Sequence, residues 1–111
     1  CSCSAALEGY ERQLLGGQGN VSVTANLAPC LMHDLCRHAL AGDIAQARAI
    51  QAQLLPLHQL LFVEPNPIPL KWAMERLGLC TGHMRLPLTT HSAPYTPALE
   101  QALKNAKLLA A

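Results

Sequence analysis

Residues 57–73 read LHQLLFVEPNPIPLKWA, and this stretch separates two helical patterns. Before it, apolar residues recur at helical spacing as far as Leu61. Within it, the prolines of residues 64–69 fix the backbone and disfavour helix in the residues that precede them. After it, we expect a short helix from Leu70 to Leu77, ended by Gly78. The stretch therefore predicts a helix, a rigid turn and a second helix.

Two helices are predicted on the N-terminal side of this turn. Pro29 suits a first helical turn, and an apolar face follows it up to Gly42. Asp43 is a good N-cap for the next helix, in which residues 47, 50, 54, 57 and 61 are apolar. Pro56 lies inside this second helix and should kink it. We therefore expect one helix that begins near Pro29 and ends at Gly42, and a second that follows Asp43 and includes Leu61.

The ends of the chain predict a strand and a last helix. Residues 20–25 read NVSVTA, a β-branched run typical of a strand, and follow a possible helix over 5–15. Residues 81–92 are expected to be loop, with a helix from about Pro97. A lone strand leaves its edges unpaired. Together with the missing initiator methionine, this strand predicts that the chain begins partway through a longer protein.

The composition limits the class of protein. A length of 111 residues allows one domain at most, and 50% hydrophobic with 14% charged residues excludes a disordered tail. A net charge of +1 without a basic stripe gives no support for nucleic-acid binding. Charged and proline residues interrupt the longest apolar runs, so no membrane span is predicted. Five irregularly spaced cysteines favour free thiols in a reducing cytoplasm.

Cysteines and histidines near residue 33 are the first candidates for a metal site. Cys30, His33 and Cys36 fall at i, i+3 and i+6 of one predicted helix. Three such side chains do not converge easily, because position i+6 has rotated past the face of position i. We therefore expect no metal and no other cofactor. The remaining histidines are interpreted as structural or solvated: His58, His83 and His91.

A lysine and a glycine-rich stretch are the next candidates. Lys71 could be a Schiff-base amine, but packing of its stem beside Trp72, with the ammonium at a carboxylate or helix end, is the commoner use. Residues 16–19, GGQG, follow a predicted helix and precede a strand, the reverse of a phosphate-binding loop. They are interpreted as a turn. The residues alone predict the end of an α/β protein followed by helices.

Three stretches in a fixed order carry a resemblance to a known family. They are GGQGNVSVTAN at 16–26, the turn stretch at 57–73, and LPLT at 86–89. They resemble the C-terminal part of the dihydrodipicolinate synthase family of pyruvate-dependent class I aldolases, from about Leu14 to Leu109. The resemblance implies a homotetrameric (β/α)8 barrel with a small C-terminal helical domain. It also implies condensation of pyruvate with aspartate semialdehyde in lysine biosynthesis, through a lysine Schiff base.

On that template, the fold is mostly α: the last strand–helix unit of a TIM barrel followed by a helical domain, with the barrel incomplete. Residues 1–42 are expected to be the barrel remnant, with its eighth strand at Val21 to Thr24, and residues 43–111 the helical domain. Val21 matches a strand position beside pyruvate, so it is the substrate-binding candidate. The family's catalytic lysine, tyrosine and threonines lie on earlier strands, so no catalytic residue is expected here. Lys71 falls in the helical domain.

We therefore expect a segment of a cytoplasmic lyase that is inactive as this chain alone. Its expected partners are its own copies or the N-terminal portion of the barrel, with pyruvate bound by the full-length family. Residues 1–13 depart from the family pattern, as a frameshifted or truncated reading frame would. Two alternatives remain at this point: a segment of a related pyruvate aldolase such as a sialic-acid lyase, and a stand-alone helical interaction module.

Overall fold

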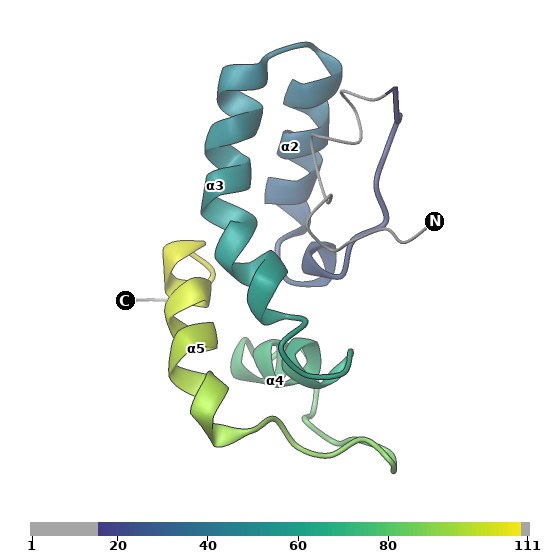
Figure 1. Cartoon of the computed structure of the whole chain (residues 1–111), viewed down its shortest axis with the longest axis vertical. Helices are drawn as coiled ribbons and strands as arrows, with labels where there is room; N and C mark the ends of the chain where they lie inside the picture. Colours follow the sequence, from purple (N-terminus) through teal and green to yellow (C-terminus); the bar gives the residue numbers. More distant parts are fainter. Residues whose placement is uncertain (1–15, 110–111) are drawn as a thin grey trace.

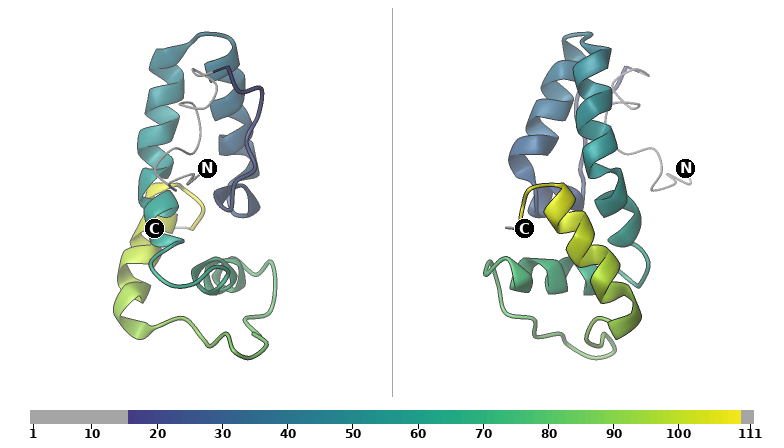
Figure 2. Two further views of the ribbon diagram at one scale, coloured as in Figure 1. Left: turned by 45° about the vertical axis from the view of Figure 1, so that its right-hand side comes forward. Right: turned by 90° about the vertical axis from the view of Figure 1, so that its left-hand side faces the viewer.

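The computed structural model describes residues 16–109, which form a pair of long helices, α2 and α3, and two shorter helices, α4 and α5, at one end of that pair (Figure 1). Helices α2 and α3 lie side by side and run in opposite directions, and α5 packs against the lower end of α3 near α4 (Figures 1 and 2). The elements in chain order are the 3-10 helix η2 (Thr24–Asn26), α2 (Pro29–Leu40), α3 (Ile44–Leu60), α4 (Ile68–Arg76), the 3-10 helix η3 (Ala93–Tyr95) and α5 (Thr96–Asn105).

The strand predicted over residues 20–25, which includes Val21 to Thr24, is not formed. Residues 17–22 have no regular secondary structure, and η2 begins at Thr24. A strand needs a hydrogen-bonded neighbour, and the described part of the chain contains no second strand to pair with it. The mostly α class is confirmed, whereas the strand is corrected to an extended segment. The helix predicted over 5–15 lies outside the described residues.

Helices α2 and α3 begin where the sequence predicts. Pro29 is the first residue of α2, a position where the missing N–H costs nothing. Gly42 has a φ of +78°, which lets the chain reverse between the helices. The Oδ1 atom of Asp43 accepts a hydrogen bond of 3.2 Å from the Gln46 backbone N–H, as an N-cap should. Helix α3 continues through Pro56 as far as Leu60.

Replacement of the α3 cap tests this local contribution. We expect Asp43→Ala to lower the free energy of unfolding by about 1 kcal/mol, because the backbone N–H group of Gln46 in the first turn loses its hydrogen-bond acceptor. Urea denaturation followed by far-UV circular dichroism measures the change. Asp43→Asn keeps a capping oxygen and should stay close to the parent chain. An equal loss in both variants would assign the effect to the carboxylate's charge beside His38 instead of the cap.

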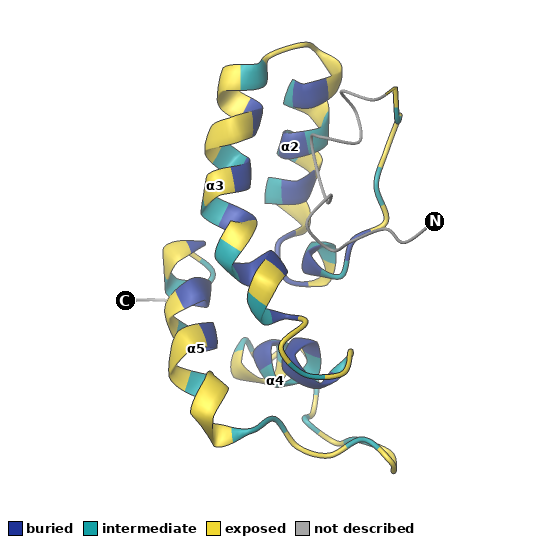
Figure 3. Cartoon of the chain, viewed as in Figure 1, coloured by how far each residue is buried: buried dark blue, intermediate teal, exposed yellow. Residues whose placement is uncertain are grey.

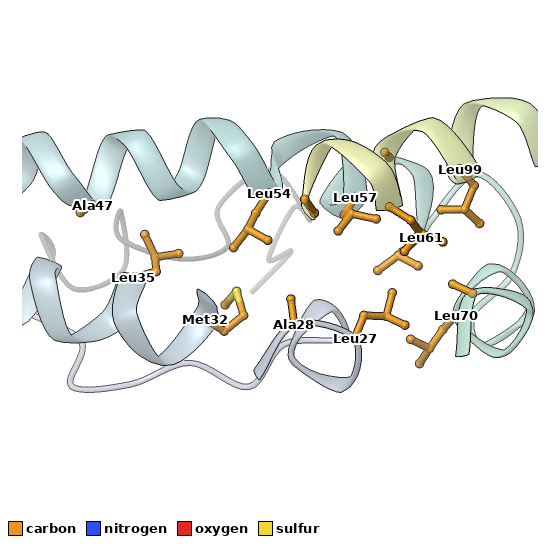
Figure 4. Packing of buried hydrophobic residues seen from close by; sticks show 14 of the residues in the cluster. Leu27, Ala28, Met32, Leu35, Ala47, Leu54, Leu57, Leu61, Leu70 and Leu99 are labelled. Carbon is orange, nitrogen blue, oxygen red and sulfur yellow. The ribbon is translucent and has the colours of Figure 1, made fainter. Parts of the chain in front are cut away.

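One hydrophobic core joins helices α2, α3, α4 and α5. Buried side chains of α2 and α3 face each other, and those of α4 and α5 meet the C-terminal end of α3 (Figures 3 and 4). The core thus runs across the boundary at residues 42 and 43. Its members are Leu27, Ala28, Met32, Leu35, Ala39, Ala47, Leu54, Leu57, Leu61, Leu70, Ala73, Leu99, Ala102, Leu103 and Ala106.

The proline-rich turn and the loop after α4 lie at the opposite end of the molecule from the turn between α2 and α3 (Figure 1). Residues 61–67 form the turn, α4 follows from Ile68, and Gly78 with a φ of +73° ends it. Residues 79–92 then form an irregular loop below α4 in Figure 1, as predicted for 81–92. Across residues 16–109, none of the helices is both long and apolar enough to cross a membrane.

Candidate functional site

Val21, the predicted substrate-binding residue, lies on the extended segment before η2. Its side chain is 97% exposed, so the described residues do not form a pocket around it. A small-molecule site buries most of its ligand and therefore needs walls on several sides. Within residues 16–109, the chain supplies no such set of walls around Val21.

The residues after Val21 are fixed to α3 by a buried polar pair. Thr24 is fully buried and His58 is 3% exposed. The Thr24 hydroxyl and the His58 Nδ1 atom share a hydrogen bond of 2.7 Å across 34 residues of sequence. This bond anchors η2, and with it the end of the extended segment, on the last turn of α3.

Glu64 is the centre of a second polar cluster, at the proline-rich turn. Its Oε2 atom accepts a hydrogen bond of 3.0 Å from the Ser92 backbone N–H, and its Oε1 atom accepts one of 2.5 Å from the Ser92 hydroxyl. The His91 Nδ1 atom lies 2.5 Å from Oε2. The two bonds from Ser92 are the main reason that the pKa of Glu64 is held below its ordinary value. The carboxylate is therefore ionised at neutral pH.

The imidazole of His91 is enclosed between aromatic rings and a small cavity. Its side chain is fully buried, 5.3 Å from the Trp72 ring and 6.4 Å from the Tyr95 ring between centroids. A cavity of about 30 Å³ lies between α4 and the loop, lined by Ile68, Trp72, Glu75, Gly82, Met84, Thr90 and His91. That volume is enough for one water molecule and too small for a substrate.

This cluster is not a hydrolytic triad, although it contains a serine, a histidine and a carboxylate. A nucleophilic serine must bond to the imidazole that removes its proton. Here the Ser92 hydroxyl bonds to the Glu64 carboxylate and not to His91, so the imidazole is not placed to remove its proton. The arrangement holds the loop in place, and it does not activate a nucleophile.

Lys71 has a structural contact. Its ammonium group donates a hydrogen bond of 2.6 Å to the His83 carbonyl oxygen. The predicted partner was a carboxylate or a helix end, so the structure corrects the partner to a loop carbonyl. A catalytic amine needs a desolvated pocket or a cationic neighbour that favours the neutral form. Lys71 is half-exposed on α4, and it connects this helix to the loop.

The cysteine and histidine pattern on α2 does not gather into a ligand set. Cys30 and His33 are exposed, and Cys36 is half-buried. Within residues 16–109, no three histidine, cysteine or acidic side chains are placed to hold one metal ion.

The sequence did not reveal either polar cluster. His58 and His91 look isolated along the chain because their partners Thr24 and Glu64 are distant in sequence. The single local signal was the position of Glu64 at the start of the rigid turn. Only the packing of α3 and of the loop brings these partners together.

A family model for the dihydrodipicolinate synthetase family matches residues 8–106, most of the chain. This chain belongs to the dihydrodipicolinate synthetase family. The family membership that the three sequence stretches predicted is therefore confirmed.

The chain matches individual members of this family over only part of their length. The 4-hydroxy-tetrahydrodipicolinate synthase of Methylibium petroleiphilum is 60% identical over 96 residues, which are 86% of this chain and 33% of that enzyme. The synthase of Leptothrix cholodnii is 62% identical over 96 residues, with the same coverage. The chain thus spans about a third of the length of the curated relatives it matches.

Solved structures of the synthetase family share this fold. A chloride-inhibited dihydrodipicolinate synthase from Acinetobacter baumannii, complexed with pyruvate, is 45% identical with a TM-score of 0.85. The match covers 90% of this chain and 34% of that one. The synthase of Thermotoga maritima is 37% identical with a TM-score of 0.87, over 91% of this chain and 34% of that one. The chain is therefore a C-terminal part of the family fold, and the barrel is incomplete.

Proposed function

We propose that this chain is the C-terminal third of a 4-hydroxy-tetrahydrodipicolinate synthase, a lyase that condenses pyruvate with aspartate semialdehyde in lysine biosynthesis. The observation that carries the proposal is the match to synthases of this name at about 60% identity across most of the chain. The proline-rich motif of residues 64–73 supports a synthase over a sialic-acid lyase. In a cell, this segment would act in the cytoplasm.

The chain alone is proposed to be inactive. The family reaction, on the resemblance described above, begins with a lysine Schiff base to pyruvate. The lysines of this chain are Lys71, Lys104 and Lys107, all beyond the expected barrel remnant. Lys71 is bonded to a loop carbonyl, and Lys104 and Lys107 lie on or just after α5. None of the three has the enclosed surroundings that a nucleophilic amine requires.

In this proposal, the chain consists of two parts of different origin, residues 1–42 and residues 43–111, which do not fold separately. The first part belongs to the barrel and the second to the C-terminal helical domain, although one core crosses between them. Val21 is proposed as a wall of the pyruvate pocket, which the preceding part of the barrel would complete. Its exposure of 97% supports this role, because an apolar residue so exposed gains stability when a partner covers it. The expected partners are that barrel portion and further copies of the chain.

Reductive trapping tests whether the chain forms a Schiff base. Incubation with pyruvate and borohydride, followed by intact mass measurement, should leave the mass of this chain unchanged. The full-length Methylibium petroleiphilum synthase, treated in the same way, should gain one pyruvate adduct per subunit. An adduct of one pyruvate per chain on this protein, lost in Lys71→Arg, would contradict the proposal.

A further inference from the structure

The loop of residues 79–92 is fastened to the rest of the molecule at two points. Near its middle, the Lys71 ammonium group on α4 donates to the His83 carbonyl oxygen at 2.6 Å. At its end, Ser92 and His91 both contact the Glu64 carboxylate of the proline-rich turn. The two points differ in chemistry, because only the second depends on the charge of a carboxylate.

Three groups converge on Glu64, whose side chain is 13% exposed. A hydrogen bond to an ionised carboxylate is about twice as strong as one to a neutral group. Protonation of Glu64 therefore weakens both bonds from Ser92 and removes the charge that faces His91. We propose that Glu64, His91 and Ser92 form an acid-released latch, which holds residues 79–92 over α4 and opens when Glu64 takes up a proton.

The surroundings of the latch place its control on Glu64. His91 has three neighbours: Glu64 on the turn, Trp72 on α4 and Tyr95 on η3. The cavity beside His91 is also lined by Glu75 of α4, whose carboxylate lies against Gly82 and is exposed. Among these groups, Glu64 alone accepts hydrogen bonds from the end of the loop. Glu75 is therefore the second carboxyl group that a test must separate from Glu64.

The lowered pKa of Glu64 fixes the direction of the response. Because the closed latch favours the ionised form, its contribution is complete above the ordinary glutamate pKa of 4.5. That contribution is lost as the pH falls through the lowered value in the closed state. The latch should thus be closed at neutral pH and open in acid.

Opening should expose Trp72 without unfolding the helices. The loop supplies Gly82, Met84, Thr90 and His91 to the cavity wall opposite Trp72. Trp72 packs against the hydrophobic core, but none of the three latch residues belongs to it. Regions with few buried apolar contacts open with less free energy than the core does.

The chain contains a single tryptophan, Trp72, so its fluorescence reports on the latch directly. Acrylamide quenching of Trp72 is measured between neutral pH and acid, with far-UV circular dichroism on the same samples. Quenching should increase in acid, with a midpoint below 4.5, while the helical signal is still intact. If Trp72 becomes accessible only together with the loss of helix, there is no separate latch and the proposal is wrong.

Four variants, two at the latch and two controls, identify the group responsible. Glu64→Gln should make Trp72 accessible at neutral pH and remove its acid response. Ser92→Ala should keep the latch but raise the midpoint by about one pH unit, since one charged hydrogen bond is lost.

Glu100→Gln is the matched control, because the pKa of this glutamate on α5 is also lowered, by Arg76, and Glu100 is not part of the latch. It should behave like the parent chain, and so should Glu75→Gln. A parent-like response in Glu64→Gln, or an unshifted midpoint in Ser92→Ala, would overturn the latch. Loss of the acid response in Glu75→Gln would assign that response to Glu75 and would also overturn the proposal.

Discussion

Leu57→Ala should lower the free energy of unfolding by about 2–5 kcal/mol, the span measured for truncation of buried leucines. Leu57 is fully buried on α3, a helix that packs against both α2 and α5 (Figure 4). The loss combines the transfer of the removed carbons with the cavity that remains between packed helices. A small domain has only about 5–15 kcal/mol of stability in total, so this single change removes a large share.

Urea denaturation of the parent and variant chains measures this loss. Leu55→Ala is the matched control, since Leu55 lies on the same helix with 41% of its surface exposed. It removes the same atoms from a position that packs poorly, and we expect less than about 1 kcal/mol. Similar losses in the two variants would mean that α3 is not packed between α2 and α5 as described.

Thr24→Val should lower the free energy of unfolding by about 1–3 kcal/mol. Valine keeps the shape of threonine, so the packing of η2 on α3 changes little. The buried Nδ1 atom of His58 loses its hydrogen bond of 2.7 Å and gains no bond to water. The cost of leaving a buried polar atom without that bond exceeds the gain from the added methyl group.

A threonine-to-serine change separates the hydroxyl from the methyl group. Thr24→Ser keeps the hydroxyl, and the same denaturation measurement should show a smaller loss than Thr24→Val. A double-mutant cycle with His58→Phe then measures the coupling between the two residues. Additive effects of Thr24→Val and His58→Phe would show that the two side chains contribute independently, against the pairing described here.

The core and the helix termini were predictable because they depend on local rules. Asp43 caps α3 and Gly42 reverses the chain as expected from the residue types alone. The apolar spacing of α3 also identified the side chains that are buried there, among them Leu54 and Leu57. The predicted short helix over 70–77 began two residues earlier, at Ile68. Proline is well tolerated in the first turn, so Pro69 did not delay it.

The candidate site was predictable only in part. Val21 was identified by resemblance, and the structure shows an exposed residue on an extended segment instead of a strand. Residue type favours a strand there, but strand formation also depends on a neighbouring strand, which the described residues do not supply. The same residue types therefore gave a short helix at Thr24, fixed by its bond to His58.

The sequence by itself determined the α-helices, the starts of α2 and α3, and the family, because capping, apolar spacing and the proline-rich motif are all read within a few residues. Only the tertiary structure decided which distant polar groups meet. Glu64 reaches His91 and Ser92, and Thr24 reaches His58, across long stretches of sequence. Neither pairing follows from spacing, because each depends on how α3, α4 and the loop pack. Burial then makes these contacts matter, since a polar group removed from water must find its partner within the fold.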